Sequence, residues 1–326
     1  MENETIKKDK PYATPIAIVI AGAMFAGAWL YNKQNPPNKI SVSENQTAAA
    51  NIPVSELEEI VLPSEGVILP VIWGALGAKL VSVGAIDEKR FKALYEERGQ
   101  FTTEYKNLLE GNNAGKAGLK ITRENAGYLL NLFWALGLAS KNPILDSGEM
   151  TNPKYGGAQN FASTAGWTLA QGDPMTHYSR HKFFNLTPDQ QALVEKVSKG
   201  IYRPCCGNST NFPDCNHGMA MLGLLELMAS QGVTEQEMWQ TALAVNAYWF
   251  PDTYITIATY LKNKGVEWSA VKPQEILGVN YSSASGYARI ASQVVQPQQS
   301  GGGNGCGVDA GQPAAALPRQ QSGCGI

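Results

Sequence analysis

The sequence predicts an all-α protein, a helical bundle domain that follows a single N-terminal transmembrane helix and precedes a disordered C-terminal tail. An uncharged run of nineteen residues at 13–31 predicts the membrane helix. From about residue 54 to 295, apolar residues recur at helical spacing, and no alternating run has the length of an ordinary strand. Residues 296–326 change to Gly, Gln, Pro, Ser and Ala, a composition that cannot form a core.

The N-terminal segments predict where the protein lies. Three lysines precede the run at 13–31 and two follow it, which favours a cytoplasmic N-terminus at 1–12 and an extracytoplasmic main domain. A cleaved signal peptide is the alternative, because Ala26-Gly27-Ala28 offers a small-residue cleavage site. Residues 32–53 are rich in Asn, Pro, Ser, Gln and Thr, and they are expected to form a linker.

Helix boundaries inside the domain at 54–295 are clearest where capping residues occur. Thr187-Pro188-Asp189-Gln190 predicts a helix that ends near Gly200, and Thr234-Glu235-Gln236-Glu237 predicts the start of another. The helix between them, 216–231, is apolar on nearly every face and is expected at the centre of the bundle. A charge that reaches the edge of the bundle explains its one acid, Glu226, as well as a catalytic role does. Further helices are predicted over 69–83, 87–98, 122–140 and 251–263, with a short one after Asp173-Pro174.

Charge and motifs exclude several classes of function. The net charge is −2 and no cluster of five or more Lys and Arg occurs, so no nucleic-acid partner is expected. The sequence has no Gly-rich phosphate loop and no Gly-x-Ser-x-Gly nucleophile motif, so no catalytic residue is predicted. The expected partners are the membrane and a further protein of the cell envelope.

The most informative segment contains three of the five cysteines and one of the three histidines: Cys205, Cys206, Cys215 and His217. Neighbouring Cα atoms are about 3.8 Å apart, shorter than an ordinary disulfide tolerates, so Cys205 and Cys206 are not expected to bridge each other. Cys215 lies at a helix start, where free N–H groups and the helix dipole favour a thiolate, and Arg203 adds a positive charge nearby.

Three interpretations of this segment stay open. Three sulfur atoms and an imidazole match a closed zinc site, and thiolate with thioether donors also suits Cu(I), so we expect a soft metal ion, copper before zinc. Met219, one turn after Cys215, is a possible additional ligand. The alternatives are a thiol-disulfide redox protein, in which Cys206 attacks and Cys215 resolves, and an envelope scaffold with a structural disulfide to Cys215.

Two further groups could contribute. His177 and His181 are four residues apart on the short helix predicted after Pro174, which would place them on one face as additional metal ligands. Solvent-facing or capping histidines are the slightly favoured alternative. Tyr178 stands where zinc peptidases carry a Glu, so peptidase chemistry is not predicted. Cys306 and Cys324 lie in the tail, and a disulfide between them is favoured over a pair of mobile thiols that attach the protein or deliver a metal.

The pieces Arg203-Pro204-Cys205-Cys206-Gly207-Asn208 and Asp214-Cys215-Asn216-His217-Gly218 resemble those of a group of uncharacterised bacterial membrane-anchored proteins. More loosely, the segment is similar to bacterial lipoproteins named for a Cys-Tyr-Cys-Gly-Cys motif and to the thiol subunit of cytochrome c maturation. The resemblance implies attachment to a membrane and no particular activity. It covers residues 203–237, and the adjacent cysteines differ in spacing from both looser relatives, so no ligand geometry follows from it.

Overall fold

The computed structural model describes residues 54–113 and 118–294. Within these ranges the chain forms fourteen α-helices, several single 3₁₀ turns and two strands of two residues each, so the all-α prediction is confirmed there. The predicted cytoplasmic N-terminus, anchor at 13–31, linker at 32–53 and tail at 296–326 lie outside the described residues. Among the helices that are described, none has the length and hydropathy needed to cross a membrane.

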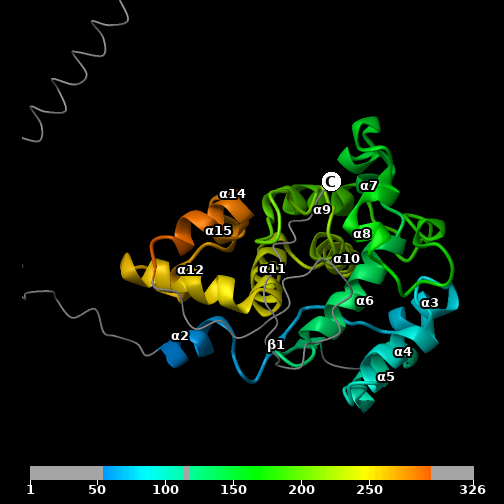
Figure 1. The fold of residues 1–326 in the computed structure, drawn as a ribbon, viewed down its shortest axis with the longest axis horizontal. Coiled ribbons are helices and arrows are strands. Elements are labelled where there is room, and N and C mark those ends of the chain that lie inside the picture. Colours follow the sequence, from blue (N-terminus) through cyan, green and yellow to red (C-terminus); the bar gives the residue numbers. More distant parts are fainter. Residues whose placement is uncertain (1–53, 114–117, 295–326) are drawn as a thin grey trace, which may run out of the picture. The chain divides into compact units, whose positions relative to one another are not determined.

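Two neighbouring helices form the centre of the bundle: α6 (Ala126–Ala139) and α10 (Asn216–Ser230) lie side by side (Figure 1). Every residue of α10 except Ser230 is buried. A helix that is apolar on all faces has to be covered on all sides, and this helix packs against α6, α8, α9 and α11. The predicted central position of this helix is therefore confirmed.

Glycines allow α6 and α10 to approach closely. A Cβ atom placed on Gly223 of α10 would lie 2.6 Å from the backbone nitrogen of Gly137 on α6, and one on Gly137 would overlap the carbonyl oxygen of Met219. Real Cβ atoms do not come this close to a backbone. The two backbones are therefore in direct contact at this crossing, and no larger residue fits at either position.

The remaining helices surround this pair. Along one side lie α9 (Pro188–Gly200) and α11 (Glu235–Trp249), and the latter leads directly into α12 (Pro251–Asn263). At one end of the bundle α12 packs with α2 (Val54–Val61) and α15 (Ala284–Ala291), next to α13 (Pro273–Ile276) and α14 (Val279–Ser282). The other end holds α3 (Leu76–Ser82), α4 (Glu88–Glu96) and α5 (Thr103–Glu110), and α7 (Pro143–Ser147) and α8 (Ala162–Ala165) follow α6.

The helix starts predicted from capping residues are confirmed. Thr187 accepts a hydrogen bond from the backbone of Gln190 while the Gln190 side chain accepts one from the backbone of Thr187, and Thr234 and Glu237 form the same reciprocal pair. Each cap is worth about 1 kcal/mol to its helix. The cysteine segment lies between the end of α9 and the start of α10.

The predicted helix over 69–83 is wrong in its first half, because α3 begins only at Leu76. Upstream, β1 (Val67–Ile68) pairs antiparallel with β2 (Lys120–Ile121), with Val67 opposite Ile121. Gly74 takes a positive φ of 59°, which a continuous helix cannot include. Pairing with a distant segment therefore overrides the local helical pattern. The helix predicted over 122–140 is likewise shorter, since α6 begins at Ala126.

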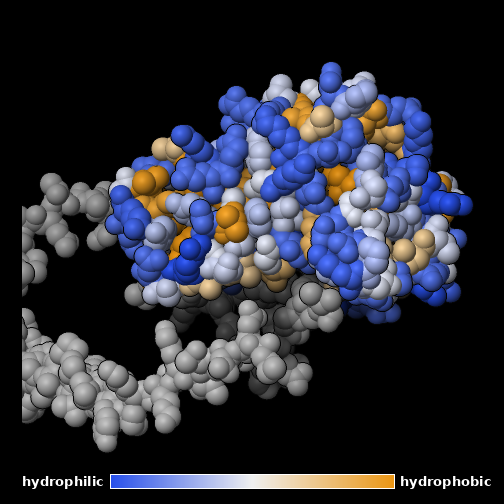
Figure 2. Space-filling model, turned by 90° about the horizontal axis from the view of Figure 1, so that it is seen from above, coloured by the Kyte–Doolittle hydropathy of each residue, from blue (hydrophilic) through white to orange (hydrophobic). Residues whose placement is uncertain are grey.

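The surface of the described domain is mixed. Figure 2 shows a face that is mainly hydrophilic, with apolar residues in several small, separate areas. Large apolar side chains that are exposed in the described ranges are few: Ile60, Ile68, Ile72, Val266 and Val279. Isolated apolar residues of this kind are ordinary on protein surfaces.

Candidate metal centre

The cysteine segment folds back on itself between α9 and α10. Cys215 is the N-cap residue of α10 and His217 lies in its first turn. Cys205 and Cys206 lie in the preceding loop, which is closed by a bridge between Tyr202 and Ser209. This loop places both cysteines against the start of α10.

The donor atoms of the two segments lie close together. The Sγ atoms of Cys205 and Cys215 are 3.6 Å apart, and all three cysteines are free thiols. One ligand atom from each of Cys205, Cys215 and His217 lies within 4.8 Å of the others, and the same holds for Cys206, Asp214 and Cys215. The prediction that these two short segments converge is therefore confirmed.

A buried arginine lies under this group. The Arg203 side chain is fully buried, and its Nη2 donates a hydrogen bond of 2.6 Å to Oδ1 of Asp214. Its Nε and Nη1 atoms are buried without a hydrogen-bond partner. The guanidinium rests against Gly218, where an added Cβ would lie 2.7 Å from Cζ of Arg203. The sequence had indicated the charge of Arg203, but not the need for a glycine at 218.

Asp214 is less available as a ligand than its position suggests. Its Oδ1 accepts from Arg203, and its Oδ2 accepts from Nδ2 of Asn208 at 2.8 Å. Burial raises the pKa of this carboxyl, although the charge of Arg203 opposes the rise. With both oxygens engaged, three sulfur atoms and one imidazole remain as the free donor set.

The three thiols differ in acidity. Hydrogen bonds from Cys205 and Cys206, together with the charge of Arg203, hold the pKa of Cys215 well below its usual value despite its burial. Hydrogen bonds to Cys206 and Cys215, with burial, raise the pKa of Cys205 well above that value. The hydrogen bond with Cys205 lowers the pKa of Cys206, but the bond with Cys215 and burial outweigh it and raise the pKa to about 11. The favoured thiolate is therefore the innermost sulfur.

His217 has a ring nitrogen that is free to coordinate a metal ion. Its side chain is only 2% exposed, and its Nδ1 is buried without a hydrogen-bond partner. The ring packs on Phe250, with centroids 4.3 Å apart, and against Trp249. A buried polar atom without a partner costs about 1–3 kcal/mol, and coordination of a metal would remove that cost. Met219, in the same turn, is fully buried, and its role as a ligand stays a prediction.

The other two histidines form a pair of their own. The 3₁₀ turn η4 (Pro174–Thr176) ends before His177, so the predicted helix that would carry both rings on one face is wrong. The chain instead turns at Ser179, whose φ is 50°, and brings Nδ1 of His177 to 3.2 Å from Nε2 of His181.

The second ring nitrogen of His177 is also engaged, because Nε2 lies 3.1 Å from the carbonyl oxygen of Gln171. Since a carbonyl can only accept, Nε2 of His177 carries a proton and donates it to this oxygen. Burial and the charges of His177 and Arg180 lower the pKa of His181. In the described part of the chain neither ring belongs to a group of potential metal ligands. Cys306 and Cys324 lie outside the described residues.

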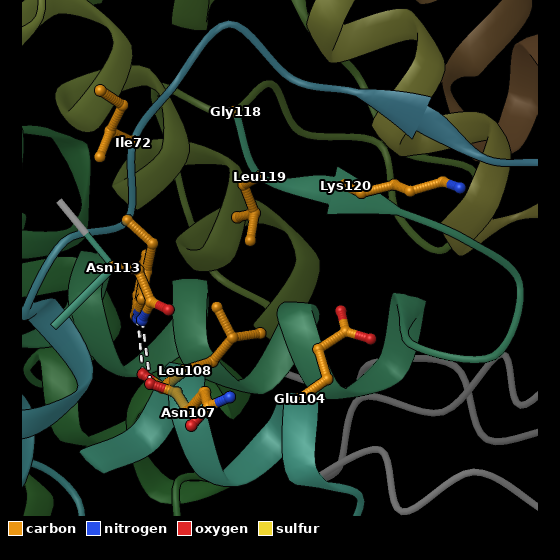
Figure 3. A pocket seen from close by; sticks show the side chains of 9 residues that line it. Ile72, Glu104, Asn107, Leu108, Asn113, Gly118, Leu119 and Lys120 are labelled. Atoms are coloured by element: carbon orange, nitrogen blue, oxygen red, sulfur yellow. Dashed lines mark hydrogen bonds between the residues drawn. The ribbon is translucent and has the colours of Figure 1, made fainter. Parts of the chain in front are cut away.

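A small cavity of about 160 Å³ lies elsewhere, between β2 and α5 (Figure 3). Nδ2 of Asn113 donates to the carbonyl oxygens of Asn107 and Gly74, and the carboxylate of Glu104 accepts from Asn125. The side chain of Lys120 extends away from the labelled residues of α5 (Figure 3). Because Asn113 and Glu104 already have partners, this cavity offers weaker grounds for a site than the cysteine segment does.

Comparison with known proteins adds no identification: no family model, no curated protein and no solved structure matches the chain. The function is therefore inferred from the geometry of the site.

Proposed function

We propose that the protein binds a soft metal ion, copper before zinc, through Cys205, Cys206, Cys215 and His217. The site has a role in binding the ion, in transferring it or in holding the structure. The observation that carries the proposal is the convergence of ligand atoms from Cys205, Cys215 and His217, with Cys206 close to Cys215. One ring nitrogen of His217, Nδ1, is buried and has no hydrogen-bond partner. Three sulfur atoms and an imidazole, held by a loop and a helix start, form a donor set that soft metal ions prefer.

The spacing of the sulfur atoms supports a shared ion. Two thiolates at about 2.3 Å from one metal ion, in tetrahedral arrangement, lie about 3.8 Å apart. The Sγ atoms of Cys205 and Cys215 are 3.6 Å apart. Binding therefore requires little movement of these two side chains.

The surroundings favour a soft ion over a hard one. Both oxygens of Asp214 are occupied by Arg203 and Asn208, which leaves no free carboxylate among the described donors of the cluster. Hard cations such as Mg²⁺ and Ca²⁺ need oxygen ligands. The guanidinium of Arg203 also compensates the negative charge of thiolates that bind the ion.

The thiol-disulfide alternative is less well supported. An attacking cysteine has to be both a thiolate and accessible to its substrate. Here the thiol with the lowered pKa, Cys215, is fully buried, while Cys206 is more accessible and has a raised pKa. In the redox alternative Cys206 attacks and Cys215 resolves. The pKa values of the two thiols do not fit these roles.

The proposal includes the location of the protein in the cell. The uncharged run at 13–31 supports a single-pass anchor with the main domain outside the cytoplasm, where an envelope protein would be its partner. Closely spaced free thiols are readily oxidised in such a compartment. A bound metal ion would protect them.

Metal analysis of the full-length chain in detergent tests the proposal. Cys306→Ser and Cys324→Ser are combined as the background, so that tail thiols cannot contribute. We expect one copper or zinc ion per chain by elemental analysis, with three thiols that react only after denaturation. Cys215→Ser and His217→Gln should each lose the ion. His181→Gln is the matched control and should retain it.

Two results would contradict the proposal. Metal-free protein that contains a Cys205–Cys215 disulfide by peptide mass spectrometry would support the structural bridge. A pair of these cysteines that is reversibly oxidised and reduced, without any bound ion, would support the redox alternative.

A further inference from the structure

Glu226 is a buried acid that the metal centre does not use. It lies on α10 and is 1% exposed, so the explanation in which its charge reaches the edge of the bundle is wrong. Its Oε2 accepts a short hydrogen bond from Oγ of Ser140 at the end of α6. Its Oε1 is buried and has no hydrogen-bond partner. A free acceptor of this kind has to be compensated by a ligand or by a proton.

This acid forms part of the wall of an open pocket. The pocket has a volume of about 450 Å³, and its lining includes Glu226, Gln191, Lys141, Lys182, Phe184 and Leu186. Because Glu226 belongs to the central helix while Lys182 is exposed, the acid lies at the inner end of the pocket and Lys182 at its mouth. The volume is within the range of small-molecule sites.

The groups beside Glu226 are already engaged with one another. Asn142 and Gln191 exchange two hydrogen bonds of 3.3 and 3.1 Å through their amide groups. Lys141 pairs with Asp146 at 2.9 Å. In the described part of the chain Lys182 forms no ion pair, which leaves its charge free at the mouth.

Further charged or titratable groups nearby are few. Glu195 accepts from Gln191, and His181 lies in a β-bridge with Ser140. Neither is hydrogen-bonded to the carboxyl of Glu226. Among the described residues, the pocket therefore has one unpartnered acceptor at its inner end, Oε1 of Glu226, and one cation without an ion pair at its mouth, Lys182.

We propose that this pocket binds a small zwitterion, a molecule with an ammonium group for Glu226 and an acid group for Lys182, as free amino acids have. The ammonium group supplies the donor that Oε1 lacks. The acid group meets Lys182, and Phe184 and Leu186 provide apolar contact for a short aliphatic part. This inference does not depend on the metal centre, since the two sites share no residue.

Binding of an ammonium group should release a proton. Burial raises the pKa of Glu226 to about 8, although the hydrogen bond from Ser140 opposes the rise. At neutral pH the carboxyl is mostly protonated before binding. An ion pair with the ligand requires the ionised form, so up to one proton leaves with each ligand bound.

Isothermal titration calorimetry on the full-length chain in detergent tests this inference. The standard amino acids are compared with n-butylamine, which has only the ammonium group, and with butyrate, which has only the acid. Measurement at neutral pH in two buffers of different ionisation enthalpy counts the protons released. We expect at least one amino acid to bind in the micromolar to millimolar range, with proton release and more tightly than n-butylamine.

Three variants assign the roles of the two charged groups. Glu226→Gln keeps the size of the side chain and should weaken amino-acid binding by about tenfold to a hundredfold and abolish proton release. Lys182→Met should weaken binding of the amino acid but not of n-butylamine. Glu65→Gln changes an exposed acid away from the pocket and should have no effect.

The inference is overturned if no test compound binds the wild type at about 10 mM, an affinity too weak to matter. It is also overturned if Glu226→Gln, shown to be folded by its circular dichroism, binds amino acids as the wild type does. Equal affinity for n-butylamine and amino acids, unchanged by Lys182→Met, would contradict the zwitterion.

Discussion

The guanidinium of Arg203 lies against the Cα atom of Gly218, in the first turn of α10. A methyl group at 218 would lie 2.7 Å from Cζ and 2.9 Å from Nη2 of Arg203. The same nitrogen, Nη2, donates to Asp214. The absence of a side chain at 218 therefore determines where the positive charge lies relative to the thiols of the metal centre.

Gly218→Ala should displace Arg203 and disturb the metal centre. We expect the free energy of unfolding to fall by about 1–3 kcal/mol, because the added methyl overpacks a buried site. Metal should also be lost to a competing chelator more readily. Gly207→Ala, in the same loop, is the control, since no atom lies within 4 Å of a Cβ there. If both variants keep the metal equally well against the chelator, the position of Arg203 does not affect metal retention.

Removal of Arg203 alone should be more damaging than removal of the whole ion pair. Arg203→Met leaves Asp214 in a partly buried position without its partner, and the unfolding free energy should fall by about 3–5 kcal/mol. The double variant Arg203→Met, Asp214→Leu should recover part of this loss. Urea unfolding of the metal-free single and double variants measures the coupling, and strictly additive losses would argue against it.

Glu226 should make the protein less stable as the pH rises. Its pKa is about 8 in the folded state against an ordinary value of 4.5, so the folded state binds more protons between these values. Its stabilising contribution is complete below about pH 4.5 and is lost as the pH rises towards about 8, by at most about 1.4 kcal/mol per pH unit. Urea unfolding of the wild type and of Glu226→Gln across this range checks the prediction. Parallel curves would show that Glu226 does not titrate as described.

Alanine at the crossing of α6 and α10 should destabilise the whole domain. Gly137→Ala or Gly223→Ala forces the two backbones apart, and we expect a loss of at least about 1–3 kcal/mol. Thermal unfolding followed by circular dichroism is the measurement, and Gly207→Ala again serves as the control. A variant as stable as this control would mean that the helices can separate at little cost.

Removal of the metal should loosen the cysteine segment more than the rest of the domain. A ligand that binds only the folded state stabilises it according to its concentration and affinity, so a chelator should lower the melting temperature. Hydrogen exchange should increase most at 203–217, since this loop is held by few backbone hydrogen bonds. Protection in α12 and α15 should change little. A uniform increase would indicate global destabilisation instead.

Local signals allowed parts of the fold to be predicted from the sequence. The capping boxes at Thr187 and Thr234 depend on residues three positions apart, and the structure has both. The helix over 69–83 failed because β1 pairs with residues more than fifty positions away. Nothing in the local pattern reports that pairing.

The candidate site, like the fold, could be predicted where local sequence signals decide it and not where distant residues do. Cys205, Cys215 and His217 could be grouped from the sequence because a short loop joins them, and their donor atoms do converge. The burial of Glu226 depends on Ser140 and on the packing of α6, so the sequence pattern misplaced it. The glycine at 218 had a visible signal, a residue without a side chain at a helix start, but its purpose required the position of Arg203.

The crossing of α6 and α10 has a mechanical consequence. His217 and Glu226 lie on one continuous helix, roughly 14 Å apart along its axis. Backbone contact at Gly137 and Gly223 prevents α10 from sliding along α6. Binding of a ligand at one of these sites can therefore affect the other only if α10 rotates or shifts as a unit. Without such a movement the two sites act independently.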